Sequence, residues 1–247
     1  AAAWEQLYAS KLEEVGFVRG LSCGVVFYHQ GRDISLAVHG DDFTFCGGEI
    51  DLLWIKKLLP TWFEIKVRGM LGPEEKDDKE IIILGRTLRW TQDGLEYEAD
   101  PKHRKMILEH FGLDSECKKL TYNGDKDTKE EDWELEPVSK EEATLFRALA
   151  ARLNYLSQDC PDLQFPIKQC SRDMASPLRG SWKKMKKIAR YLLARERIVW
   201  DFKWQEEPEF SYVAADSDWG GTIKDRKSTS GGVWMLGSHS IKTRSAS

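Results

Sequence analysis

The spacing of hydrophobic and polar residues changes along the chain, and the changes predict its elements. From Trp4 to Val15 apolar residues recur every three or four positions, which is typical of an amphipathic helix that ends at Gly16. The runs 25–28 and 34–38 read as two strands joined by a turn. Apolar residues resume at 43–45 as a third strand. This pattern predicts a hairpin with two adjacent aspartates, Asp41 and Asp42, at its tip.

The next stretch predicts a mixture of short helices and strands. Pro60 closes a helix over 50–59, and Asp100-Pro101 starts another that ends at Gly112. Strand-like patterns cover three runs, which are 62–67, 81–90 and 95–97. Thr91-Gln92-Asp93-Gly94 is predicted to turn the chain into the last of these.

The second half opens with helices and then returns to alternation. Ser139 and Glu142 have the spacing of a capping box before a long helix, and Pro161 opens a second helical segment. A third helix is predicted over 182–193. Alternation then returns in IVWDFKW, FSYVAADSDW and GGVWML, which predict a second β-rich unit. The pattern as a whole indicates an α+β protein.

Composition agrees with a folded protein and shows that charge is segregated. The chain has 247 residues, of which 41% are apolar, and a formal net charge of -4. The acidic run 125–142 reads as an exposed linker, while 179–197 is strongly basic. The cysteines are scattered, without a CxxC pair, which favours a reducing intracellular setting, cytoplasmic or nuclear. No apolar run approaches the roughly 20 residues of a membrane span, so no membrane partner is expected.

Two interpretations of Asp41-Asp42 stay open. Gly-Asp-Asp is good turn chemistry, because glycine accepts positive φ and aspartate hydrogen-bonds its own backbone. Alternatively, the two carboxylates hold magnesium, which prefers hard oxygen ligands and acts on phosphates. Without a cation they repel by about 1 kcal/mol at 4 Å in water, which favours a visiting metal.

Two further groups invite both a structural and a functional interpretation. Asp216 and Asp218 are two residues apart in a predicted strand and so share one face of it. They are either a solubility feature of an edge strand or part of a second metal site. The basic helix presents a charged face that either is only solvated or contacts nucleic-acid phosphates. Its charged residues are Lys183, Lys184, Lys186, Lys187 and Arg190.

Taken together, the motifs resemble the C-terminal part of the Pol polyprotein of copia-type LTR retrotransposons. LAVHGDDFTFCG is similar to the Tyr-Val-Asp-Asp hairpin of that family, and AADSDWGGTIKDRKSTSGGVWMLG is similar to its "SDADWAGD..DRKSTSGY.F.LG" motif. The runs IIILGRTLRWTQDGLEYEADPKHRKMILEHFGL and LFRALAARLNYLSQDCPDLQFPIKQCSRDMASPLRGSWKKMKKIARYLL resemble further family blocks. The resemblance covers essentially the whole chain.

The resemblance implies a reverse transcriptase with RNase H, acting by two-metal nucleotidyl transfer with magnesium or manganese. It implies a partial palm and following hairpin over 1–112, an acidic linker over 113–138, a helical thumb or connection over 139–197 and the N-terminal part of an RNase H-like domain over 198–247. Asp41 and Asp42 would then be the catalytic, metal-binding aspartates of the palm. Asp216 would be the first RNase H carboxylate, with Asp218 as a further metal ligand.

The implied partners are an RNA or DNA primer-template, dNTPs and the remaining polyprotein segments. His39, which takes the place of the family tyrosine, would lie near the primer, and the basic helix would face the duplex. His39-Gly40 departs from the family pattern. The upstream palm aspartate and the downstream RNase H glutamate are not found in this sequence, so we expect the isolated chain to be feeble or inactive. The alternative is a non-catalytic nucleic-acid-binding or interaction module derived from a decayed element.

Overall fold

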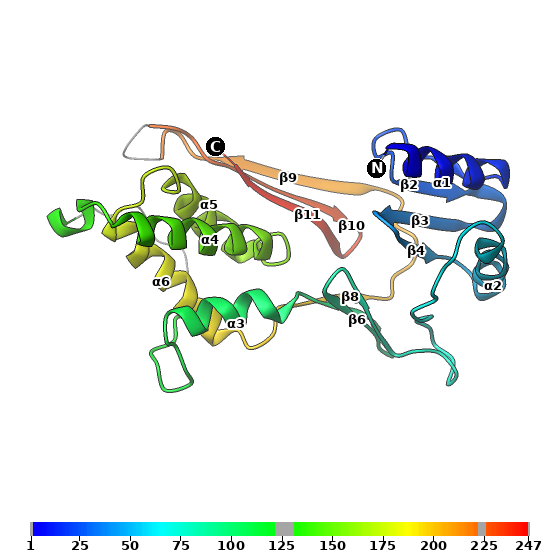
Figure 1. The fold of residues 1–247 in the computed structure, drawn as a ribbon, viewed down its shortest axis with the longest axis horizontal. Coiled ribbons are helices and arrows are strands. Elements are labelled where there is room, and N and C mark those ends of the chain that lie inside the picture. Colours follow the sequence, from blue (N-terminus) through cyan, green and yellow to red (C-terminus); the bar gives the residue numbers. More distant parts are fainter. Residues whose placement is uncertain (1, 122–130, 222–225, 247) are drawn as a thin grey trace. The chain divides into compact units, whose positions relative to one another are not determined.

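The computed structural model describes residues 2–121, 131–221 and 226–246 (Figure 1). The chain forms two compact units, Ala1–Arg68 and Gly69–Ser247. Helices and antiparallel sheets build both of them, which confirms the predicted α+β class. Within the described ranges, no helix combines the length and apolar character needed to cross a bilayer.

Unit 1 is a four-stranded antiparallel sheet with helices on one face. The strands lie in the order β1-β2-β3-β4. Gly16, with φ +100°, ends the first helix where the sequence predicts it. The elements are α1 (Ala2–Glu14), β1 (Val18–Arg19), β2 (Val26–His29), η1 (Gln30–Arg32), β3 (Ile34–His39), β4 (Asp42–Cys46), α2 (Glu49–Leu58) and η2 (Leu59–Thr61).

The core of unit 1 follows from the alternation in β3. Ile34, Leu36 and Val38 are buried, whereas the residues between them are exposed. Tyr8 of α1 and Ile55 of α2 belong to the same buried cluster. The helices therefore cover one face of the sheet, and the opposite face is left open.

The strand predicted over 62–67 is wrong. This segment joins no sheet, although Trp62, Phe63 and Ile65 are partly buried against the core of unit 1. The Phe63 ring, for example, lies edge-on to Trp4 with centroids 5.0 Å apart. The alternation here records side-chain packing and not pairing of the backbone in a ladder.

Unit 2 contains a second four-stranded antiparallel sheet in the order β5-β6-β7-β8. The single strand predicted over 81–90 is two strands, because Leu84 (φ 50°) and Gly85 (φ 80°) reverse the chain. The strand predicted at 198–204 forms, but it pairs with β7 and not with the strands that follow it. The strands are β5 (Glu80–Ile83), β6 (Arg86–Trp90), β7 (Gly94–Glu98) and β8 (Val199–Lys203).

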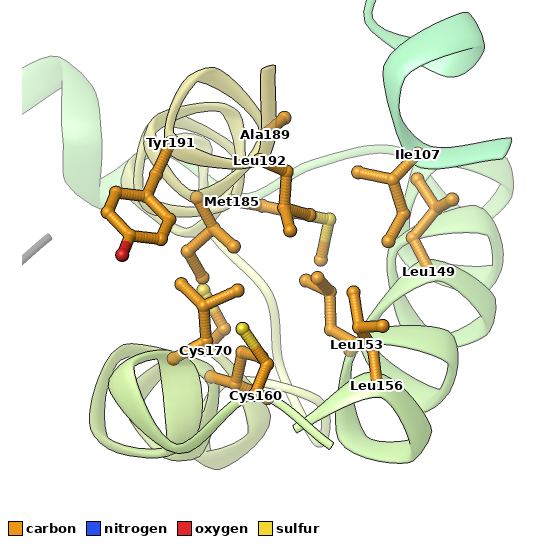
Figure 2. Close-up of a cluster of buried hydrophobic side chains, with 14 of the residues drawn as sticks. Ile107, Leu149, Leu153, Leu156, Cys160, Cys170, Met185, Ala189, Tyr191 and Leu192 are labelled. Atoms are coloured by element: carbon orange, nitrogen blue, oxygen red, sulfur yellow. The ribbon is translucent and has the colours of Figure 1, made fainter. Parts of the chain in front are cut away.

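Four α-helices form the hydrophobic core of unit 2. Asp100 caps the first and accepts a hydrogen bond from Lys102 N, and the predicted capping box of Ser139 and Glu142 forms at the second. Figure 2 shows side chains from two of these helices pointing toward one another. Leu149 and Leu153 come from the second helix, and Met185 and Leu192 come from the fourth. The helices are α3 (Pro101–His110), α4 (Lys140–Leu156), α5 (Gln164–Arg172), preceded by η4 (Pro161–Leu163), and α6 (Arg179–Ala194).

A three-stranded antiparallel sheet, in the order β11-β10-β9, completes the described part of unit 2. Its strands are β9 (Ser211–Ser217), β10 (Ser230–Leu236) and β11 (His239–Ala246). Helix α5 lies beside β11, where Gln164 Nε2 donates to Thr243 Oγ1 at 2.8 Å (Figure 1). The compact units divide the chain at Arg68, not at the family-based boundary of 112. Those boundaries concern functional domains and stay predictions.

The acidic run was expected to be an exposed linker, and this is wrong for part of it. Residues 125–130 lie outside the described residues. The following residues form η3 (Asp132–Leu135), in which Glu134 is buried and pairs with Lys183 of α6. A neighbouring contact joins Arg179 and Glu136, 2.8 Å apart. The acidic segment therefore packs on the basic helix, because opposite charges satisfy each other there.

A buried carboxylate connects the helices to the β5–β8 sheet. Asp159, after α4, has a side chain only 6% exposed. It lies 3.1 Å from an Arg86 terminal nitrogen and accepts a hydrogen bond from Tyr97 Oη at 2.8 Å. Its backbone carbonyl accepts the indole N–H of Trp200 in β8 at 2.7 Å. Burial beside this carboxylate raises the pKa of Tyr97 above its usual value, so the tyrosine remains a donor.

We expect Asp159→Asn to lower the free energy of unfolding of unit 2 by about 3–5 kcal/mol, because it leaves the Arg86 guanidinium buried without its counter-charge. Tyr97→Phe removes one hydrogen bond and should cost about 1 kcal/mol. Amide hydrogen exchange in α4 and β7 reports on unit 2 alone.

The matched control is Asp93→Asn at an exposed turn, with an expected change within about 0.5 kcal/mol. If Asp159→Asn costs no more than Tyr97→Phe, the carboxylate does not have the central role assigned to it.

Candidate functional site

The predicted aspartates lie at the β3–β4 hairpin. His39 pairs with Asp42 across the ladder, so Gly40 and Asp41 form the two-residue turn. Gly40 has φ +63°, which a glycine adopts at little cost. The indole N–H of Trp4 in α1 donates to Gly40 O at 2.9 Å. The turn that carries the carboxylates is thus anchored to the helix behind the sheet.

The open face of the unit 1 sheet leads to this turn. Because Val38 is buried and alternate residues point to opposite faces, His39 lies on the open face. Asp42 is its cross-strand partner and shares that face, while Phe43 packs toward the core. Away from the turn the same face carries Ala37 and its two partners, Val26 and Thr44. The aspartates therefore stand at one end of an uncovered sheet surface.

The two carboxylates differ in their surroundings. Asp42 Oδ1 lies 3.0 Å from a terminal nitrogen of Arg68, whose side chain is 70% exposed. Asp41 is exposed at the turn. The arginine offsets one of the two adjacent negative charges, and its exposure leaves it free to move away if a cation binds. Sequence reasoning missed Arg68, because it lies in an irregular segment with no pattern to place it.

The donor set fits a hard divalent cation only in part. Two carboxylates at an exposed turn supply the oxygen ligands that magnesium takes. Among the residues that the structure describes, however, no three His, Cys, Asp or Glu side chains come together as a metal site. The hairpin by itself offers two ligands, and any further ones would come from elsewhere.

Asp216 and Asp218 lie at the end of β9 and have different environments. Asp216 is in the strand, opposite Gly231, and is exposed. Asp218 lies just beyond the strand, where its Oδ1 accepts a hydrogen bond from Thr229 N at 2.5 Å. Its own N–H donates to Thr229 O at 3.0 Å. The structure thus gives Asp218 a part in closing the β9–β10 pair. Among the residues that it describes, no third acidic group joins the two in a metal site.

The basic helix α6 forms, with Met185, Ile188 and Leu192 buried on one side and the charged side partly paired. Lys183 forms an ion pair with Glu134, which raises the pKa of the lysine and lowers that of the glutamate. Lys184 Nζ lies 3.6 Å from Asp173 Oδ2. Lys186 is exposed, whereas Lys187 and Arg190 are half-buried. A phosphate approaching Lys183 would have to compete with a carboxylate already in place.

The comparisons with known proteins give one informative match. The chain is 30% identical over 252 residues to the retrovirus-related Pol polyprotein from transposon RE2 of Arabidopsis thaliana. The match covers 97% of this chain and 16% of that polyprotein. No family model matches the chain, and no solved structure matches it. The similarity supports the prediction of a transposon Pol polyprotein segment.

We expect Gly40→Ala to destabilise the β3–β4 hairpin by about 1–2 kcal/mol, because an L side chain is strained at this positive φ. An added Cβ would meet no atom within 4 Å, so the cost comes from backbone strain alone. Hydrogen exchange of β3 and β4 amides measures it.

Gly31→Ala is the control, because its φ is outside the left-handed region and its added Cβ meets only ordinary contacts with His29. Equal effects of the two substitutions would show that the conformation of Gly40 is not what shapes the turn.

Proposed function

We propose that this chain is the reverse transcriptase and RNase H segment of a copia-type Pol polyprotein, whose parent enzyme is an RNA-directed DNA polymerase. The observation that carries the proposal is the paired-aspartate hairpin. It lies in a chain of which 97% is similar to a transposon Pol polyprotein. The chain spans about a sixth of that relative, so the activity belongs to the larger protein.

The reaction is attack of a primer 3′-hydroxyl on the α-phosphorus of a nucleoside triphosphate, with pyrophosphate as the leaving group. Magnesium, when bound, neutralises phosphate charge and favours ionisation of the attacking hydroxyl. Asp41 and Asp42 would hold it through their carboxylate oxygens. His39 lies on the same open face as Asp42. We propose that it contacts the primer terminus.

A complete site requires more than this hairpin provides. The described residues bring no third ligand to Asp41 and Asp42. The chain matches only 16% of its polyprotein relative, so we propose that other polyprotein segments supply it. The same reasoning applies to Asp216, proposed as one carboxylate of the RNase H site.

The helical segment is proposed to contact the primer-template through α6. Lys186 is exposed, and it has no ion-pair partner among the described residues. Lys183, by contrast, is held by Glu134. Phosphate contacts by exposed lysines release counterions and weaken with salt, which gives this part of the proposal a measurable signature.

We expect the intact chain to bind Mn²⁺ weakly at the hairpin, and Asp41→Asn with Asp42→Asn to weaken that binding by roughly tenfold or more, because two charges close to a divalent ion are removed. Electron paramagnetic resonance of free Mn²⁺ measures it, with Asp93→Asn as control. Unchanged Mn²⁺ binding in the double variant would contradict a metal site at the hairpin.

Primer extension tests the incompleteness of the site. The isolated chain should give little or no templated synthesis with magnesium or manganese. Robust extension that Asp41→Asn abolishes would show instead that the chain holds a full set of ligands.

We expect joint replacement of the four α6 lysines by glutamine to weaken RNA–DNA duplex binding on all sequences, and to flatten log K against log salt by about 0.9 per lost phosphate contact. Singly, Lys186→Gln should weaken binding more than Lys183→Gln, because Glu134 already occupies Lys183. Fluorescence anisotropy across a salt series measures both effects.

The matched control replaces four exposed lysines outside α6, which are Lys102, Lys105, Lys118 and Lys119. If the control weakens binding as much as the α6 variant does, only overall charge matters and α6 is not the interface.

A further inference from the structure

The β9–β11 sheet presents a basic and aromatic face that the proposed polymerase and RNase H sites do not use. Strand pairing places Val213, Trp234 and Lys242 in one cross-strand row. Ala215, Gly232 and Arg244 form the next row, two residues along each strand and therefore on the same face. We call these six residues the outer face.

Helix α5 lies on the opposite side of the sheet. Thr243, which receives the hydrogen bond from Gln164, is between Lys242 and Arg244 in β11 and so points the other way. Asp216, Gly231 and Ser245 form another cross-strand row. This row is one residue away from the Ala215 row, so its side chains point to the opposite face. The outer face is therefore separate both from the helix and from the proposed RNase H carboxylate.

The outer face is exposed and carries charge of one sign. Val213 is 66% exposed and Trp234 is 44% exposed, a large fraction for an indole in the central strand of a sheet. Lys242 and Arg244 are exposed as well. Among the strand residues that share this side of the sheet, within the described part of the chain, none is acidic. The surface therefore suits an anion with flat apolar groups.

We propose that the outer face binds single-stranded nucleic acid, with a base stacked on Trp234 and phosphates paired with Lys242 and Arg244. Proteins that bind single strands combine aromatic side chains, on which bases stack, with cations along the path of the nucleic-acid backbone. Such stacking tolerates any base sequence. The small residues Gly232 and Ala215 beside the indole leave room for the neighbouring base. Lys242 and Arg244 are about 7 Å apart along β11, so they can meet different phosphates.

The charge pattern favours this occupant over an apolar protein surface. A partner that buried the outer face without acidic groups would have to desolvate Lys242 and Arg244 unpaired, which is costly. A single strand leaves both cations in contact with solvent and phosphate, and it uses the exposed indole as well. An acidic peptide without aromatic side chains would satisfy the cations but would leave Trp234 without a stacking partner.

The test uses the whole chain and a fluorescein-labelled 15-residue oligothymidylate, with anisotropy measured across a salt series. Trp234→Ala should weaken binding by roughly 5- to 100-fold, whereas Trp234→Phe, which keeps a stacking ring, should retain most of it. Replacing Lys242 and Arg244 by glutamine should flatten the salt slope by about 0.7 for each lost contact.

Two matched controls separate this face from its surroundings. Tyr212→Ala removes an exposed aromatic residue from the opposite face of the same sheet and should leave affinity unchanged. Replacing Lys102 and Lys105 of α3 by glutamine removes two charges elsewhere and should change the slope less than the outer-face pair does. Circular dichroism of each variant confirms that the sheet is intact.

Three results would overturn the proposal. They are equal losses in Trp234→Ala and Tyr212→Ala, loss of single-strand binding only in the α6 lysine variant, and equal competition by polyglutamate of matched charge. The last would assign the face to an acidic protein partner. None of these outcomes bears on Mn²⁺ binding at the β3–β4 hairpin, so the proposed polymerase site stands or falls separately.

Discussion

The buried carboxylate of Asp159 is the interaction on which the arrangement of unit 2 depends. It joins the end of α4 to Arg86 of β6, Tyr97 of β7 and, through its carbonyl, Trp200 of β8. A carboxylate removed from water is tolerated only when it is paired and hydrogen-bonded, so these groups must come together or the charge is left unsatisfied. The indole of Trp200 binds the carbonyl and not the carboxylate, and it adds a further hydrogen bond where β8, far along the chain, completes a sheet begun before α3.

The same physics limits which charges are available for function. Lys183 already has Glu134 as a counter-charge, and Asp42 has Arg68. The two pairs are not equivalent, because Glu134 is buried while Arg68 is largely exposed. Displacing Arg68 costs little, since an exposed pair contributes at most about 1 kcal/mol. The hairpin carboxylates are therefore more accessible to a new cation than Lys183 is to a new anion.

Local signals in the sequence predicted the elements whose causes are local. The caps at Asp100 and Ser139, the end of α1 at Gly16 and the hairpin with Asp41 are examples. Predictions failed where the cause is distant in sequence. The 62–67 pattern reflects packing on Trp4, the burial of Glu134 needs Lys183, and the β8 partner is β7. The Leu84-Gly85 reversal was missed because leucine rarely adopts a positive φ.

The candidate site shows the same division between local and distant causes. A tight turn brings two neighbouring carboxylates together through local sequence alone, and the β3–β4 hairpin does this with Asp41 and Asp42. Further ligands for a metal must come from other elements, and within the described ranges none reaches the turn. The outer face of the β9–β11 sheet differs, because strand pairing alone assembles its indole and its two cations. The outer face would therefore bind a single strand without help from other segments, whereas nucleotidyl transfer at the hairpin would require the rest of the polyprotein.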